Sequence, residues 1–231
     1  MSTRTQIQQH INNLLSQLQN YVTNLSNLGI QPSRVPDLYQ LYCLLKILSE
    51  LRAKGCNIEV TTTQAPNSLV LPLNPWPVTT RGERTLDDSI NKYRRQYSLI
   101  KVNYVEPSTG INIHFEIYYN LCVPYRLKSS YRSLLCQAPD IIVIYDQNIV
   151  VVKDAKYSAT GSISLAKLIR TILGYYNTLV NREKANFVSK IINEFSAIIT
   201  NINITATAYW RDNRVKEFLL GNNIKIISEP V

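Results

Sequence analysis

Two short and nearly continuous apolar runs in the middle of the chain constrain its fold more than any other feature. They are residues 141–145 and 149–152, separated only by Asp146, Gln147 and Asn148. A three-residue connection is short enough for a β-hairpin, and continuous apolar runs are typical of strands that are covered on both faces. We therefore expect a central sheet with other layers packed against it.

The ends of this hairpin carry charged residues. If Gln147 is the centre of the hairpin, Asp140 lies directly opposite Asp154, and Ile144 lies opposite Val150. Directly opposed residues have Cβ atoms about 5 Å apart, so the two carboxylates repel each other. A bulge near the turn would shift the pairing by one residue and turn Asp140 to the other face.

A divalent cation between the two carboxylates would explain their placement. Lys156 follows Asp154 by two residues and therefore projects from the same face. Mg²⁺ binds one or two protein carboxylates together with water and phosphate oxygens, and a nearby lysine orients the attacking water or neutralises developing charge. We expect Asp140, Asp154 and Lys156 to be catalytic, with Asp140 and Asp154 as metal ligands. The alternative is that Asp154 and Lys156 pair with each other on a solvated face.

The charge of the chain favours a polyanionic partner. Its formal net charge is +9 and its pI is near 9.4. Such an excess gives affinity for phosphate backbones, so we expect nucleic acid before acidic small molecules. Arg126, Lys128 and Arg132 before the hairpin, and Lys167 and Arg170 after it, are the candidate phosphate contacts. Charged groups of this kind are also common on solvated faces.

The N-terminal segment has a heptad pattern. Its apolar positions are Ile7, Ile11, Leu14, Leu18, Tyr21, Leu25 and Leu28. A seam of this kind is typical of a coiled coil, and it predicts a homodimer through residues 1–30. The alternative is an amphipathic helix that folds back on its own domain. Residues 31–231 form the second predicted unit.

The remaining pattern indicates one α/β domain with a mixed sheet flanked by helices. A second helix is expected over about residues 37–54, with Gly55 ending it. Strands are expected at 57–63, 98–105, 111–119, 204–210 and 224–228, and helices at 164–179, about 183–199, and 213–220.

Length and composition limit the class of protein. A chain of 231 residues with 45% hydrophobic and 18% charged residues supports one buried core. The sequence has no membrane-spanning run and no signal peptide, so we expect an intracellular, cytoplasmic protein without membrane association. The widely spaced Cys43, Cys56, Cys122 and Cys136 are interpreted as small core residues, and not as a disulfide or zinc framework.

The hairpin region also resembles a known family. Residues 138–144 and 149–157, which end in Asp-Ala-Lys-Tyr, resemble the core of PD-(D/E)xK nucleases, particularly nuclease subunits of modification-dependent restriction systems. Residues 37–46 are similar to the first core helix of that branch. The resemblance implies a restriction-endonuclease-like fold and a Mg²⁺- or Mn²⁺-dependent endodeoxyribonuclease. It also implies the Ala155 carbonyl as a third metal ligand, DNA as substrate, and a motor or defence-system partner.

The sequence departs from the family pattern at one position. The first helix of that branch commonly has a glutamate where this chain has Gln40. Glu116 or Glu50 can take its place, although Glu50 is flanked four residues away by Lys46 and Lys54 and is expected to pair with them. The departure keeps a second hypothesis open, a catalytically inactive DNA-binding or assembly subunit. A coiled-coil adaptor unrelated to nucleic acid is a third.

Overall fold

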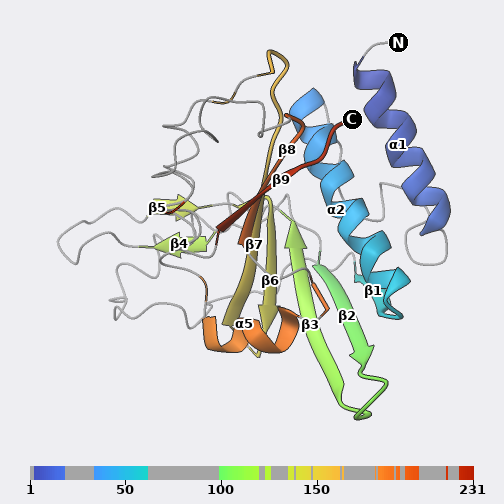
Figure 1. Ribbon diagram of the computed structural model, residues 1–231, viewed down its shortest axis with the longest axis vertical. Helices are drawn as coiled ribbons and strands as arrows, with labels where there is room; N and C mark the ends of the chain where they lie inside the picture. Colours follow the sequence, from blue (N-terminus) through green and yellow to red (C-terminus); the bar gives the residue numbers. More distant parts are fainter. Residues whose placement is uncertain are drawn as a thin grey trace.

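Within the part of the chain that the structure describes, the strands form one seven-stranded mixed sheet and a separate two-stranded pair (Figure 1). The computed structural model describes residues 3–18, 34–61, 99–119, 123–125, 135–137, 139–146, 148–161, 163, 180, 182–189, 191–192, 196–202, 217 and 224–231. The mixed α/β class expected from the sequence is confirmed by this sheet and its helices.

The main sheet has the strand order β1-β2-β3-β6-β7-β8-β9. Its strands are β1 (Asn57–Thr61), β2 (Leu99–Val105), β3 (Asn112–Tyr119), β6 (Ile141–Tyr145), β7 (Asn148–Lys156), β8 (Ser196–Thr200) and β9 (Ile224–Ser228). Neighbouring strands from β1 to β7 are antiparallel, whereas β7, β8 and β9 run parallel. The separate pair is β4 (Val123–Tyr125) with β5 (Leu135–Gln137).

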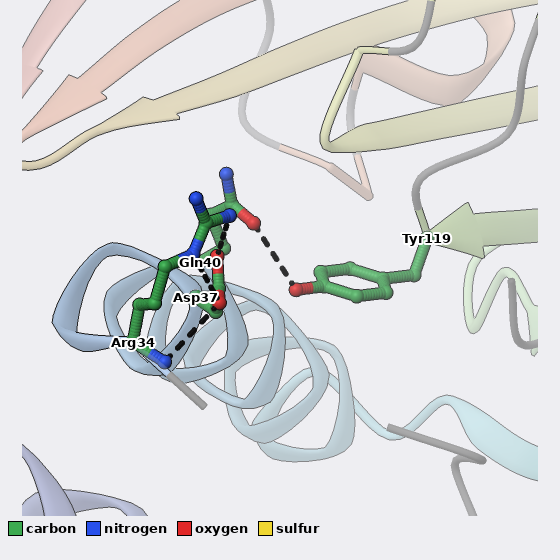
Figure 2. A network of polar contacts seen from close by, with 4 residues as sticks. All are labelled: Arg34, Asp37, Gln40 and Tyr119. Atoms are coloured by element: carbon green, nitrogen blue, oxygen red, sulfur yellow. Dashed lines mark hydrogen bonds and ion pairs between the residues drawn. The ribbon is translucent and has the colours of Figure 1, made fainter. Parts of the chain in front are cut away.

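Helix α2 (Val35–Ala53) matches the predicted second helix. Pro36 is compatible with the first helical turn, where a backbone N–H has no intrahelical acceptor. Just before the helix, the backbone N–H of Arg34 donates to the Asp37 carboxylate at 3.2 Å, and the Arg34 guanidinium forms an ion pair with it at 3.0 Å (Figure 2). Gly55 ends the helix in a left-handed conformation, with φ of +86°.

Most of α2 is buried because it lies over one face of the main sheet. Its buried residues are Leu38, Tyr39, Leu41, Tyr42, Cys43, Leu44, Leu45, Ile47, Leu48 and Leu51. They share a core cluster with strand residues such as Ile117, Val143 and Val151, which define what we call the α2 face of the sheet. Each such side chain contributes roughly 1.5–3 kcal/mol through burial.

Helix α1 (Thr3–Gln17) lies alongside α2 of the same chain (Figure 1). Its heptad residues Ile7 and Ile11, together with Leu18, are fully buried in the core cluster that includes α2. For residues 3–18 the structure therefore shows the fold-back alternative. A second chain cannot use these buried side chains unless the contact between α1 and α2 opens. The later heptad positions lie outside the described residues.

The β6–β7 hairpin has the predicted register at its open end and a different one beside its turn. Ile142 pairs with Val152, as the centre at Gln147 requires. Nearer the turn, Ile144 pairs with Ile149, so the predicted pairing of Ile144 with Val150 is wrong. Val150 is the extra residue of a β-bulge in β7.

The turn itself explains this shift. Tyr145 pairs with Asn148, so only two residues connect the strands instead of the three that were expected. Asp146 has a φ of +48°, a left-handed conformation that aspartate adopts more readily than most residues. The shorter turn moves the adjacent pairs by one residue, and the bulge restores the predicted register beyond it.

The C-terminal region differs from the sequence prediction. A helix was expected over about residues 183–199, but α5 (Arg182–Ser189) is much shorter, and residues 196–200 form β8 between β7 and β9. The run Ser-Ala-Ile-Ile-Thr is rich in β-branched residues, which suit a strand buried inside a sheet. The final predicted strand is confirmed as β9.

Some predicted elements cannot be compared with the structure. The helix at 164–179 and the strand at 204–210 lie outside the described residues, as does the helix at 213–220 except for helical Glu217. None of the helices in the described ranges combines the length and the apolar character that crossing a bilayer requires.

Candidate active site

Asp140 and Asp154 lie at the open end of the β6–β7 hairpin. Pro139 directly precedes Asp140, and because proline has no backbone N–H it suits the start of a strand. The first pair of the ladder joins Ile141 to Lys153, and the next step outward places Asp140 opposite Asp154. The register at this end is therefore the one predicted from the sequence.

The two aspartates share the sheet face opposite α2. Side chains alternate along a strand, and Ala155 belongs to the core cluster under α2, so Asp154 projects the other way. Asp140 is 5% exposed and Asp154 is 1% exposed. The backbone N–H of Ala155 donates to Asp140 Oδ2 at 2.6 Å, which ties the two strand ends together.

The Ala155 backbone points toward Asp140. In an antiparallel ladder the N–H and C=O of one residue face the same neighbouring strand. The Ala155 carbonyl is therefore directed to the same side as the N–H that binds Asp140. This direction is compatible with the third ligand that the nuclease resemblance implies.

Lys156 completes the cluster from the same face of β7. Its Nζ forms an ion pair with Asp154 Oδ2, and the lysine side chain is 18% exposed. The alternative that the sequence left open was an ion pair between Asp154 and Lys156 on a solvated face. The ion pair is present, but the face is not solvated, because Asp154 is buried. Lys156 is the member of the cluster closest to solvent.

The electrostatics of Asp140 favour binding of a cation. Burial raises the pKa of Asp140 well above its usual range, and the negative charge of Asp154 raises it further. The positive charge of Lys156 and the Ala155 N–H act in the opposite direction. A positive ion between the carboxylates would offset both the burial and the repulsion.

The donor set fits a hard divalent cation. Asp154 Oδ2 is buried and accepts no hydrogen bond among the described residues, its ion-pair partner being Lys156. Two carboxylates and one carbonyl are oxygen ligands of the kind that Mg²⁺ and Mn²⁺ prefer, with water completing the shell. In the described ranges no group of three or more His, Cys, Asp and Glu side chains is placed to hold a metal, so such an ion would need backbone and water ligands as well.

Gln40 does not join the carboxylate pair. It lies on α2, and its Oε1 accepts a hydrogen bond from the Tyr119 hydroxyl at 3.3 Å (Figure 2). Tyr119 pairs with Ile141 at the end of β3, on the α2 face. Gln40 is thus close to the start of β6, and its side chain is directed to Tyr119.

Glu116 and Glu50 also lie away from the pair. Glu116 is opposite Ile144, four residues along β6 from Asp140, which corresponds to roughly 13 Å at the usual rise of a strand. Its carboxylate accepts a hydrogen bond from the Tyr118 hydroxyl at 2.8 Å. Glu50 lies on α2, against the other face of the sheet.

The expected partners of Glu50 are engaged elsewhere. Lys46 forms its ion pair with Glu229, and Lys54 Nζ donates to the Ile191 carbonyl at 2.8 Å. The predicted pairing of Glu50 with these two lysines is therefore wrong. The long lysine side chains reach the C-terminal residues and the chain after α5, which the helix pattern alone does not reveal.

The predicted phosphate contacts cannot be compared with the structure. All five basic residues proposed to contact phosphates, Arg126, Lys128, Arg132, Lys167 and Arg170, lie outside the described residues.

Cys43 and Cys56 are buried and free, as expected for small core residues. Burial raises the pKa of both thiols, to about 11 for Cys56.

Two neighbours of the cluster were missed by the sequence prediction. Ile198 and Thr200 of β8 pair with Asp154 and Lys156, and Thr200 is a fully buried polar residue. They were missed because residues 196–200 were assigned to a helix. The signal was the β-branched run before Asn201, whose side-chain Oδ1 accepts a hydrogen bond from the Ser158 N–H at 2.8 Å, just after β7.

Comparisons with known proteins add no further assignment. No family model, no curated protein and no solved structure matches this chain. The geometry of Asp140, Asp154 and Lys156 must therefore carry any functional conclusion.

Proposed function

We propose that the chain is a metal-dependent endonuclease that hydrolyses phosphodiester bonds in DNA at Asp140, Asp154 and Lys156. The observation that carries the proposal is a pair of buried carboxylates on adjacent strand ends, with an ammonium group beside them. Buried like charges are costly unless they serve a bound ion. The net charge of +9 supports a polyanionic substrate.

Each residue of the cluster has a separate role in the proposed reaction. Asp140, Asp154 and the Ala155 carbonyl would hold Mg²⁺ or Mn²⁺, which when bound supplies Lewis-acid polarisation of a phosphoryl oxygen. Lys156 Nζ, the most exposed group of the cluster, orients the attacking water or neutralises charge that develops on the phosphate. The Ala155 N–H keeps Asp140 directed toward β7.

The arrangement of the sheet agrees with the resemblance to PD-(D/E)xK nucleases. The two acidic positions come from adjacent antiparallel strands, β6 and β7, and a helix near the N-terminus packs on the sheet. A restriction-endonuclease-like fold, with residues 31–231 as the nuclease unit, is part of the same proposal. DNA as substrate and a motor or defence-system partner follow from it.

A homodimer through the N-terminal helix has less support. The burial of Ile7 and Ile11 against α2 uses the residues that would form its seam. Dimerisation through residues 1–30 would require α1 to leave that position.

Cleavage by matched variants tests the nuclease proposal. Asp154→Asn keeps the shape of the side chain but removes a metal ligand, so cleavage of DNA with Mg²⁺ or Mn²⁺ should fall by at least 100-fold, in line with removal of a group central to catalysis. Glu116→Gln is the control, since it removes a carboxylate from the same face roughly 13 Å away. Retained cleavage in Asp154→Asn would overturn the proposal.

A catalytically inactive DNA-binding or assembly subunit is the second candidate. Gln40 favours it, because the corresponding glutamate of the resembled branch is absent and Gln40 is directed to Tyr119. Calorimetric titration with Mn²⁺ separates the two functions. A nuclease binds the ion through Asp140 and Asp154, whereas an inactive subunit that has lost the site gives no heat attributable to these residues.

A further inference from the structure

The ion pair between Lys156 and Asp154 involves an oxygen that the candidate metal site needs. Lys156 Nζ contacts Asp154 Oδ2, and within the described part of the chain this oxygen accepts no hydrogen bond. The Asp154 side chain is 1% exposed, whereas that of Lys156 is 18% exposed. The ammonium group therefore reaches from the more exposed side of the cluster to a buried carboxylate.

The position of Lys156 in β7 gives its ammonium group a choice of direction. Lys156 is the last residue of the strand, and it projects from the same face as Asp154 because the two residues are two positions apart. A lysine side chain has a flexible four-carbon stem. At the end of a strand, such a stem can direct the ammonium group either to Asp154 or outward to solvent.

The charge of Lys156 acts on both carboxylates of the pair. Burial and the charge of Asp154 raise the pKa of Asp140, and Lys156 is the largest of the influences that lower it. Lys156 is thus close enough to Asp140 to offset part of the repulsion between the aspartates. A divalent cation in the proposed site would offset the same repulsion.

We propose that the Lys156 ammonium group is an internal counter-ion of the aspartate pair, which competes with a divalent cation for Asp154 Oδ2. The inference rests on the proposed nuclease function and adds a condition for loading the site. Lys156 must give up its ion pair before Asp154 can serve fully as a ligand. Two positive charges at one buried oxygen repel each other strongly, because a protein interior screens charges less than water does.

A phosphate group of the substrate is the alternative partner for Lys156. Lysine binds phosphate as a point charge, and the side chain of Lys156 is the most exposed of the cluster. A phosphate that attracts the ammonium group frees Asp154 Oδ2 for the cation. Because coupling between two binding sites is reciprocal, the cation also increases the affinity for phosphate. Lys156 therefore couples the binding of metal to the binding of DNA.

Calorimetric titration of the full chain with Mn²⁺, without nucleic acid, tests the competition. Lys156→Gln removes the competing charge, so Mn²⁺ should bind at least 10-fold more tightly than to the native chain, in line with the loss of one contact between charged groups. A lysine that only supports the metal ligands would give the opposite sign. Lys156→Arg keeps the charge and should show no such gain. Lys101→Gln removes a charge from an exposed position on β2 and should leave the affinity unchanged.

Thermal unfolding of the same proteins provides a second measurement. In EDTA, Lys156→Gln leaves Asp154 without its ion-pair partner, so its Tm should be lower than that of the native chain. Saturating Mn²⁺ should raise the Tm of Lys156→Gln by more than it raises that of the native chain, because the variant binds the ion more tightly. Lys156→Met, which keeps the apolar stem of the lysine, is the second variant and should behave in the same way.

The outcomes separate this inference from the nuclease function. Equal or weaker Mn²⁺ binding by Lys156→Gln and Lys156→Met overturns the inference, as does an equal gain in Lys156→Arg or Lys101→Gln. If the native chain cleaves DNA in a metal-dependent way and these variants gain no affinity, the inference fails while the nuclease function stands. If neither the native chain nor any variant binds Mn²⁺, both fail.

Discussion

Asp140 is a buried carboxylate that faces a second one across a strand pair, an unfavourable position for a negative charge without a cation. Its pKa is raised by burial first and by Asp154 second. A carboxyl whose folded pKa is raised contributes stability that is complete below its unfolded pKa and is lost as the pH rises through the folded value. At neutral pH Asp140 therefore lowers the free energy of unfolding of the metal-free chain.

Asp140→Asn should stabilise the metal-free protein at pH 7 while removing Mn²⁺ binding. The amide is neutral, and its oxygen can still accept the hydrogen bond from the Ala155 N–H. We expect a gain in the free energy of unfolding on the order of 1 kcal/mol or more, equivalent to roughly 2–4 °C in Tm per kcal/mol for a chain of this size. Thermal unfolding in EDTA measures it.

The control for this variant is Asp146→Asn, which removes a carboxylate that is 59% exposed and paired with Lys184 in the turn. An exposed pair contributes little, so Tm should change by about 2 °C or less. A lower Tm for Asp140→Asn than for the native chain would contradict the account of the aspartate pair.

Lys153 gives a second prediction at the scale of single residues, for a buried positive charge instead of a negative one. Burial lowers its pKa to about 8, Lys225 acts in the same direction and Glu50 opposes. The unfolded chain then binds more protons than the folded one between pH 8 and roughly 10.4, so the free energy of unfolding of the native chain rises with pH there. The stability that the neutral form of Lys153 contributes is lost as the pH falls through 8.

Lys153→Met should remove this pH dependence. The variant is expected to be more stable relative to the native chain near pH 7 than near pH 10.5, because methionine does not titrate whereas the buried lysine is charged at the lower pH. Urea unfolding of both proteins across this range provides the comparison, because other titrating groups cancel in the difference. A difference that is constant with pH would show that Lys153 is not held as a buried ammonium.

At the scale of secondary-structure elements, the burial of its apolar residues shows that α1 packs against α2. Its heptad pattern is compatible with a coiled coil or with a fold-back helix, since both bury the same stripe. The sequence cannot separate them because the partner helix, α2, is itself apolar on nearly all sides. The structure shows Ile11 in the core cluster with α2.

Ile11→Ala should therefore destabilise the folded chain by about 2–4 kcal/mol, the usual cost of a cavity at a buried isoleucine. Gln9→Ala, at an exposed position of the same helix, should change the free energy of unfolding by less than about 0.5 kcal/mol. Urea unfolding at two protein concentrations is the measurement. A midpoint that rises with concentration in the native chain but not in Ile11→Ala would indicate a dimer seam instead.

The hairpin shows how far a local pattern predicts an element. The apolar runs were sufficient to predict β6 and β7, and mirror symmetry placed Asp140 opposite Asp154. A bulge near the turn was an alternative that the sequence left open, and the structure has one at Val150. Its expected consequence is wrong, because the register beyond Val150 keeps Asp140 opposite Asp154. β8 was missed because its pairing with β7 is parallel and is formed by residues more than 40 positions apart.

At the scale of the whole molecule, the chain carries opposite charges on the two faces of one strand. Asp154 projects from β7 away from α2, and Lys153 projects toward α2, where it lines a pocket of about 480 Å³. The side that carries Asp154 was predicted from the sequence, because Asp154 and Lys156 are two residues apart on one strand and Asp140 lies across a short hairpin. The side that carries Lys153 was not predicted, because Lys153, Ala197 and Lys225 meet only when three distant strands align.

The central claim is that Asp140, Asp154 and Lys156 form a metal-dependent nuclease site, and a plasmid assay tests it most directly. Supercoiled plasmid and single-stranded DNA are incubated with the native chain and with Lys156→Ala, in Mg²⁺, Mn²⁺ or EDTA. The account predicts nicking or cleavage by the native chain that requires metal and falls by at least 100-fold in Lys156→Ala. Metal-dependent cleavage that persists unchanged in Lys156→Ala, or no cleavage by the native chain with either metal, would contradict it.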